Sequence, residues 1–314
     1  MNPRWRPVAV NLASGAAALF AAVVALILAM DLLGDPAAFQ LPMESDEAAR
    51  AAFRAEHGLD QPLSVRLAAR VTALAQGRFG ESQWLRRPAA AVVAEHLPAT
   101  VALAALAVPG GLAGGVIIGL ALGLSAGRRW AARLRAAMLA GFAVPGFVVA
   151  IVAIQLVAVE WRLLPASGFD TWTALILPAG LLAAGFAMRL GLLLQDRLTA
   201  LTGQPFVRFA RAKGLSHALV LRRHLLRPAA GLALGYASLQ LGYLLGGALV
   251  MESVFAIPGL GRLAVLALAN RDLPLLQACL VVAGSCFLAV RLVADLLHAA
   301  LDPRPGLGAV APAR

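Results

Sequence analysis

Six long apolar stretches constrain this 314-residue chain more than any other feature of its sequence. A helix needs about 20 apolar residues to cross the hydrocarbon core of a bilayer, and each stretch is at least that long. Hydrophobic residues make up 61% of the chain, against about 45–50% in soluble domains. Because lipid cannot satisfy exposed backbone groups, the spans are expected to be helical. The sequence therefore predicts an all-α integral-membrane protein with about six transmembrane helices, at residues 8–33, 98–125, 136–159, 171–194, 228–250 and 275–301.

The basic residues are concentrated on one side of the predicted spans. Fifteen of them fall in the N-terminus, at 128–135, at 197–227 and after Asp302. Positively charged connections remain in the cytoplasm, so both termini are expected there. The same rule accounts for the net charge of +11 without nucleic-acid binding, because no basic surface interleaved with aromatic residues is visible. The first stretch is longer than the apolar core of a signal peptide, which indicates an uncleaved span.

The remaining sizeable polar segment, 34–97, follows the first span and is expected to face outward. Its periodicity predicts two short helices, at 44–57 and 63–76. About 60 residues without a strong apolar core would be marginally stable alone, so we expect the segment to pack on the membrane domain. The predicted organisation is a first helix at 1–33, this periplasmic segment, a five-helix core at 98–302 and a cytoplasmic tail at 303–314.

Glycine recurs at every fourth position in the second predicted span, from Gly111 to Gly127. Such a stripe lets another helix backbone approach closely. Two interpretations remain open for it, ordinary membrane packing and a seam between moving helices. Gly242 and Gly246 repeat the spacing in the fifth span.

The long basic connection at 197–227 is the most informative stretch of the chain. Pro205 suits the first turn of a helix, and Gly214 suits its C-terminal end. Arg211 and Lys213 lie near that end, where the helix dipole favours cations. These features predict a short amphipathic helix on the cytoplasmic face.

The stretch Phe206–Ser216 resembles the coupling loop of binding-protein-dependent ABC importers, and most closely that of the dipeptide, oligopeptide and nickel permease branch. Arg208 stands where the general motif of these loops has glutamate, as is usual in this branch. In that family the loop forms a short helix that docks into a groove on the ATP-hydrolysing subunit. The resemblance assigns this coupling role to Pro205, Phe206, Arg208, Ala210, Arg211, Ala212, Lys213 and Gly214.

Weaker matches to the same family occur in order along the chain. They include Leu97–Thr100, a segment from Glu252 to Arg262, and the pair Asp272 and Pro274. The resemblance implies that the segment containing Glu252 lies at the outward face, near the binding protein or the mouth of the pathway. For Glu252 a structural role is favoured over contact with cargo. The residues assigned to this outer gate are Glu252, Phe255, Pro258, Gly259 and Gly261.

The resemblance implies the type I ABC importer permease fold and a transport subunit in a bacterial inner membrane. The expected cargo is a peptide, with a nickel complex or another small solute as alternatives. The implied partners are a second permease, two ATP-binding subunits and a periplasmic solute-binding protein. No phosphate-binding Gly-x-x-x-x-Gly-Lys-Ser/Thr motif is present, so ATP and Mg²⁺ are expected on the partners and no cofactor on this chain.

The alternative class is an integral-membrane enzyme. Such an enzyme needs convergent polar groups, whereas the five histidines are scattered and no His-Glu-x-x-His motif occurs. Arg291 and Asp295 are spaced to form an ion pair within the last span, and Arg189 lies inside the fourth. Cys279 and Cys286 suit buried apolar positions. These few groups predict no tight cargo or metal site within the membrane.

Overall fold

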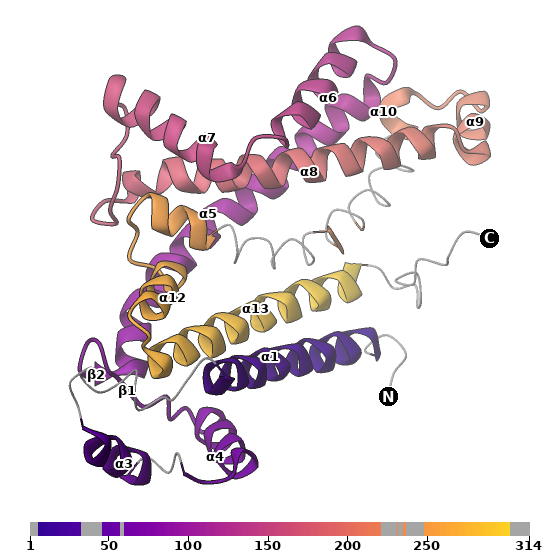
Figure 1. Cartoon of the computed structure of the whole chain (residues 1–314). Coiled ribbons are helices and arrows are strands. Elements are labelled where there is room, and N and C mark those ends of the chain that lie inside the picture. The colour runs from indigo at the N-terminus through magenta and orange to yellow at the C-terminus, as the bar shows by residue number, and fades with distance from the viewer. Residues whose placement is uncertain are drawn as a thin grey trace. The chain divides into compact units, whose positions relative to one another are not determined.

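The computed structural model describes residues 6–32, 46–56, 60–220 and 248–301, together with 231, 235 and 236. Nearly all regular structure in these ranges is helical (Figure 1). The chain divides into two compact units, which are described separately. One contains Met1–Val8, Ala99–Pro258 and Ala289–Arg314, and the other contains Ala9–Pro98 and Gly259–Leu288.

Four helical segments in the described part of the chain are long and apolar enough to cross a membrane. They lie in α1 (Arg6–Leu32), in α5 (Ala89–Leu124), in α8 (Ile176–Thr202) with the 3-10 turn before it (Trp172–Leu175), and in α13 (Leu273–Leu301). A bent pair of helices can supply a fifth span. Most of the predicted span at 228–250 lies outside the described residues. The all-helical membrane fold is thereby confirmed.

The predicted span at 136–159 is not one continuous helix. It consists of α6 (Arg129–Gly141), then α7 (Gly146–Ala153) and a π-helical turn (Ile154–Glu160), bent by 100° at the break. Figure 1 shows α6 and α7 running in different directions. Pro145 has no N–H to donate and disfavours helical geometry in the residue before it, which accounts for the interruption.

In the second unit the two predicted outward helices are present, as α3 (Glu47–Glu56) and α4 (Leu63–Ala75). Two elements were not predicted. A short antiparallel pairing joins β1 (Glu81–Ser82) to β2 (Arg87–Pro88), and α12 (Leu260–Ala269) precedes α13. Helix α5 also begins at Ala89 rather than at residue 98, because Val92 and Val93 are buried against Leu260 and Leu275.

Asp272 connects the β1–β2 pair to the beginning of α13. Its side chain is buried and accepts hydrogen bonds from the Ser82 hydroxyl and from the backbone N–H of Trp84 at 3.1 Å. The other carboxyl oxygen accepts the N–H of Leu275, also at 3.1 Å, in the position of a helix N-cap. Asp272, one of the matches to the family motifs, is therefore joined to Ser82 in one buried network.

In the first unit the glycine stripe of α5 packs against α8. A Cβ atom built on any of four stripe glycines would lie within 3.0 Å of an α8 side chain, so only glycine allows this approach. The stripe is thus covered by α8, which favours the packing interpretation. Gly127 lies beyond the end of α5 with φ +88° and has no such neighbour. The facing pairs are Gly111 with Phe186, Gly115 with Leu190, Gly119 with Leu194 and Gly123 with Leu198.

Candidate functional site

The predicted coupling helix is present as α9 (Pro205–Ala212) and lies at the end of α8 (Figure 1). Pro205 occupies its first position, as the fixed φ of proline favours. The chain leaves the helix through Gly214, whose φ of +82° is in the left-handed region that glycine adopts readily. The Leu215 N–H donates to the Ala210 carbonyl at 3.3 Å and closes the end of the helix.

One face of α9 is buried in its own chain. Val207 is fully buried and Ala210 is 5% exposed, both within an apolar cluster that includes Leu198 and Leu201 of α8. The same cluster extends along α8 to Phe186 and takes in part of the glycine-stripe helix. An eight-residue helix would not be stable alone, so this packing holds α9 in place.

The opposite face of α9 exposes two aromatic rings, of Phe206 at 46% and Phe209 at 64%. The Lys213 ammonium lies 4.6 Å above the centre of the Phe209 ring, so a cation covers part of that ring. The predicted coupling residues Arg208, Ala212, Lys213 and Gly214 are also exposed. The side chain of Arg211 lies outside the described residues.

Phe209 was missed by the sequence analysis, although a usable signal was present. Phe206 and Phe209 are three positions apart and therefore share a helix face, while Val207 and Ala210 share the next one. The family pattern emphasised the small and basic residues of this loop instead. The structure makes Ala210 a packing residue, and it makes the two phenylalanines the largest exposed apolar groups on the helix.

The second predicted group, around Glu252, has a different environment. Glu252 is fully buried, and its Oε1 accepts a 2.6 Å hydrogen bond from the hydroxyl of Thr100 on α5. Phe255 is 1% exposed and packs with Leu103, and its carbonyl accepts the Gly168 N–H at 3.0 Å. Glu252 and Phe255 are therefore packed within this unit.

The remaining residues of that group differ in exposure. Pro258 is exposed, Gly259 is buried and Gly261 is partly exposed. Gly259 directly precedes α12 and adopts an extended conformation with φ −104°. The placement of this segment at the outward face stays a prediction.

Charged groups inside the spans are few among the described residues. The predicted pair is present, with Nε of Arg291 4.0 Å from Oδ2 of Asp295. Cys279 is buried and Cys286 partly buried, and neither forms a disulfide bond. Within the described ranges no three His, Cys, Asp or Glu side chains lie close enough to hold a metal ion.

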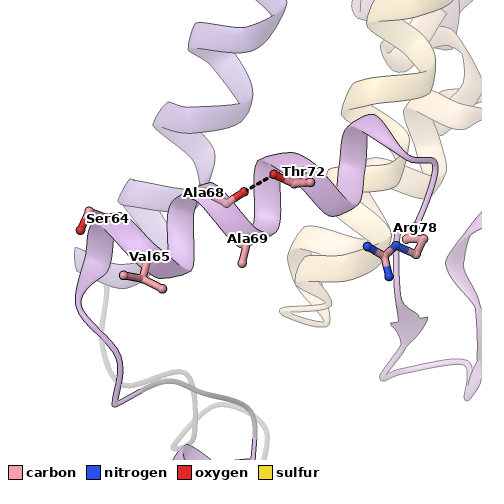
Figure 2. Close-up of a pocket in the computed structure, with 6 residues that line it drawn as sticks. All are labelled: Ser64, Val65, Ala68, Ala69, Thr72 and Arg78. Atoms are coloured by element: carbon pink, nitrogen blue, oxygen red, sulfur yellow. Dashed lines mark hydrogen bonds between the residues drawn. The ribbon is translucent and has the colours of Figure 1, made fainter.

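A hollow on the outward segment lies along α4 (Figure 2). It is lined by Val65, Ala68 and Ala69, with Ser64 at one end and Arg78 at the other. The hydroxyl of Thr72 donates to the Ala68 carbonyl at 2.7 Å, and Arg78 donates to the side chain of Gln76. The lining is mostly small and apolar, with one charged side chain, so it lacks the converging polar groups of a specific small-molecule site.

Two comparisons with known proteins bear on these features. Residues 115–306 match the family described as binding-protein-dependent transport system inner membrane component. The glutathione transport system permease protein GsiC of Salmonella typhimurium is 34% identical over 289 residues, which cover 91% of this chain and 93% of the relative. The protein of the same name from Escherichia coli K12 is 35% identical over 290 residues, 91% of this chain and 94% of the relative. The family match includes α9, Glu252 and the whole of α8.

Proposed function

Because the chain belongs to the family of binding-protein-dependent transport system inner membrane components, we propose that it forms half of an inner-membrane pathway for a peptide-type solute. It is a permease subunit of an ABC importer rather than an enzyme. Our proposal concerns the cargo, the coupling role of α9 and the partner subunits.

The proposed cargo follows from the relatives. They are named for the transport of glutathione, which is a tripeptide, and their similarity extends over 91% of this chain. The same class was expected from the motifs in the sequence. Small peptides carry a free carboxylate at neutral pH, a property that any passage for them must accommodate.

The coupling role rests on the exposed aromatic face of α9. Phe206 and Phe209 would each be more stable against an apolar surface than in water, by about 25 cal/mol per Å² covered. Arg208 and Lys213 beside them can pair with acidic groups at the rim of a groove. We assign the face to a groove on an ATP-binding subunit, which the resemblance of this loop also implies.

The buried face of α9 offers a path for motion. Val207 and Ala210 pack against Leu198 and Leu201 of α8, so a displacement of α9 acts directly on that helix. The tight approach of the α5 glycines to Leu190 and Leu194 then joins α8 to α5. Closely packed helices move as units rather than deforming continuously, so these three helices are suited to transmit an ATP-driven displacement.

The remaining components follow from the family. We propose that this chain works with a second permease subunit, two ATP-binding subunits that hold ATP and Mg²⁺, and a solute-binding protein. The basic connections support a cytoplasmic location for both termini. In this orientation α9 lies on the side where ATP is available.

A photo-crosslinking experiment tests the coupling role. Phe209 is replaced by a benzophenone-bearing phenylalanine in the assembled importer, and irradiation is expected to join this chain to an ATP-binding subunit. The same substitution at Trp172, which is 75% exposed before α8, is the matched control and should give no such product. Equal adducts from both positions, or none from Phe209 in an importer that transports, would contradict the assignment of α9.

A further inference from the structure

Arg189 is the central residue of α8, a 27-residue helix. It lies inside the predicted fourth span at 171–194, about 8 Å from the C-terminal end of that span. Its guanidinium carbon is 5.7 Å from the centre of the Phe142 ring, and its side chain is exposed. Charged side chains within membrane spans are rare and almost always face the interior of a helix bundle or a water-filled cavity, so this position favours a polar environment.

The packing of α6 on α8 explains why Arg189 is exposed. The two helices run antiparallel, and Arg135 Nη1 donates to Asp196 Oδ1 at 2.7 Å near one end of their contact. Met138 and Leu192 share a buried cluster farther along. Phe142 comes next and meets Arg189. Helix α6 ends at this point, so it does not cover α8 beyond Arg189.

The break between α6 and α7 lies beside the same side chain. Residues 142–145 are not helical, and they fall near the middle of the bent pair. Irregular backbone within a membrane occurs where it is buried in protein or lines a water-filled cavity. Phe142 and Val144 in the break are 38% and 46% exposed. An arginine within one span and an interruption of the neighbouring helix pair, both unfavourable against lipid, thus occur together.

We propose that Arg189 and the break at 142–145 line the translocation passage and form a transient contact for the carboxylate of the passing solute. This inference rests on the proposed function, since it is the peptide-type cargo that carries the carboxylate. The planar guanidinium donates two parallel hydrogen bonds to a carboxylate. A single such contact in a hydrated passage is weak, so it attracts the anion without holding it. A tight cargo site in the membrane remains unexpected.

The test uses a cysteine as a reporter of local charge. Phe142→Cys is introduced into the assembled importer after Cys279 and Cys286, the two native cysteines, have been replaced by alanine. Small methanethiosulfonate reagents, one anionic and one cationic, are then applied in nucleotide-free and ATP-bound states. The anionic reagent is expected to react faster, roughly tenfold relative to the cationic one, as a single charge about 6 Å away in water predicts.

Variants of the arginine identify the source of this preference. Arg189→Gln should abolish it, Arg189→Lys should retain it, and Arg128→Gln in the connection before α6 should leave it unchanged. Failure of both reagents in every state would place the position against lipid or the second permease subunit and overturn the inference. Equal rates for the two reagents with Arg189 intact would do the same.

Measuring solute uptake distinguishes a failure of this inference from a failure of the proposed function. Proteoliposomes with the complete importer are supplied with glutathione and the solute-binding protein. Arg189→Gln should lower the uptake rate severalfold while stimulation of ATP hydrolysis by the binding protein persists. If the unaltered importer takes up no peptide, the proposed cargo is wrong, whereas the labelling result still shows whether Arg189 faces an aqueous passage. If the unaltered importer takes up peptide normally and Arg189→Gln does so equally well, the carboxylate contact is excluded. The exposure of Arg189 to an aqueous passage would still be decided by the labelling result.

Discussion

Helix α9 and the Glu252 segment were both selected from sequence motifs, but their side chains have opposite environments. Helix α9 exposes Phe206 and Phe209. The second segment buries Phe255 completely and hydrogen-bonds the carboxyl group of Glu252 to Thr100. An exposed aromatic ring can be used by a partner, whereas a buried one stabilises its own unit. The same type of residue is therefore accessible to a partner in one region and packed within the chain in the other.

This difference shows that a match to a family motif does not reveal whether a residue contacts a partner or stabilises its own chain. Glu252 and Phe255 match the family as well as Arg208 does. Their packing shows that they hold α5 to the segment before α12. Substitutions that compare the two regions should therefore separate effects on stability from effects on coupling.

Paired phenylalanine substitutions give the largest expected difference in the free energy of unfolding. Phe255→Ala should destabilise the protein by about 3–5 kcal/mol, because it empties a fully packed position. Phe209→Ala should cost less than about 1 kcal/mol, since the ring is exposed and loses mainly its contact with Lys213. Unfolding of the detergent-solubilised chain by added SDS measures both.

The effects of these two substitutions on docking with the ATP-binding subunit should follow the opposite order. Phe209→Ala should reduce association with the ATP-binding subunit while the chain still inserts and folds. A large loss of stability from Phe209→Ala would show that its ring is a packing group. An undiminished association would show that this ring is not the docking contact.

The buried hydrogen bond from Thr100 to Glu252 should have a smaller effect. Glu252→Ala is expected to cost about 1.5–3 kcal/mol, as is usual when a hydrogen bond to an acidic group is lost. Glu252→Gln should cost less, because its amide oxygen can still accept the Thr100 hydroxyl. A double-mutant cycle with Thr100→Val measures the coupling, for which about 0.5–3 kcal/mol is expected.

Glu160 provides the matched control for this carboxyl group. It is exposed at the end of the π-helical turn, so Glu160→Ala should change stability by less than about 0.5 kcal/mol. If Glu252→Ala unfolds no more easily than the control yet abolishes uptake, Glu252 acts on the cargo or the binding protein. The structural assignment would then be wrong.

Much of the fold could be predicted because the relevant signals are local. Length and hydropathy located both ends of α13 and the beginning of α8 within a few residues. The C-terminus of α8 was placed too early, because polar turns after Leu194 continue the helix. Pro205 and Gly214 defined α9, since their backbone preferences act without help from distant residues. The Arg291–Asp295 pair followed from helical spacing alone.

Features that depend on distant contacts could not be predicted. The capping role of Asp272 requires Ser82, which lies far away in the sequence. The glycine stripe was recognised, but its partner α8 could not be identified because small residues tolerate many neighbours. The exposure of Phe209 likewise depends on which face of α9 is buried by α8. Tertiary packing decided each of these cases.

Two glycines compare the end of α9 with an ordinary helix end, and their substitution should cost less stability than Phe255→Ala. Gly214 and Gly127 have φ of +82° and +88°, and neither has an atom within 4 Å of where a Cβ would lie. Gly→Ala should therefore cost roughly 1–2 kcal/mol at each, from backbone strain alone. Asn at either position should cost less, since it enters the left-handed region more readily than alanine.

The two positions should differ in coupling, measured as solute taken up per ATP hydrolysed. The left-handed turn at Gly214 follows α9 directly and directs Leu215 back to the Ala210 carbonyl. Strain there favours unwinding of α9, the helix that we propose meets the ATP-binding subunit. Gly127 ends α5 in a different connection, where the same strain leaves α9 intact. Gly214→Ala should thus lower the coupling ratio severalfold, and Gly127→Ala should leave it near the unaltered value. Equal reductions at the two glycines would show that coupling responds to global stability, and α9 would then have no special part in transmitting ATP-driven motion.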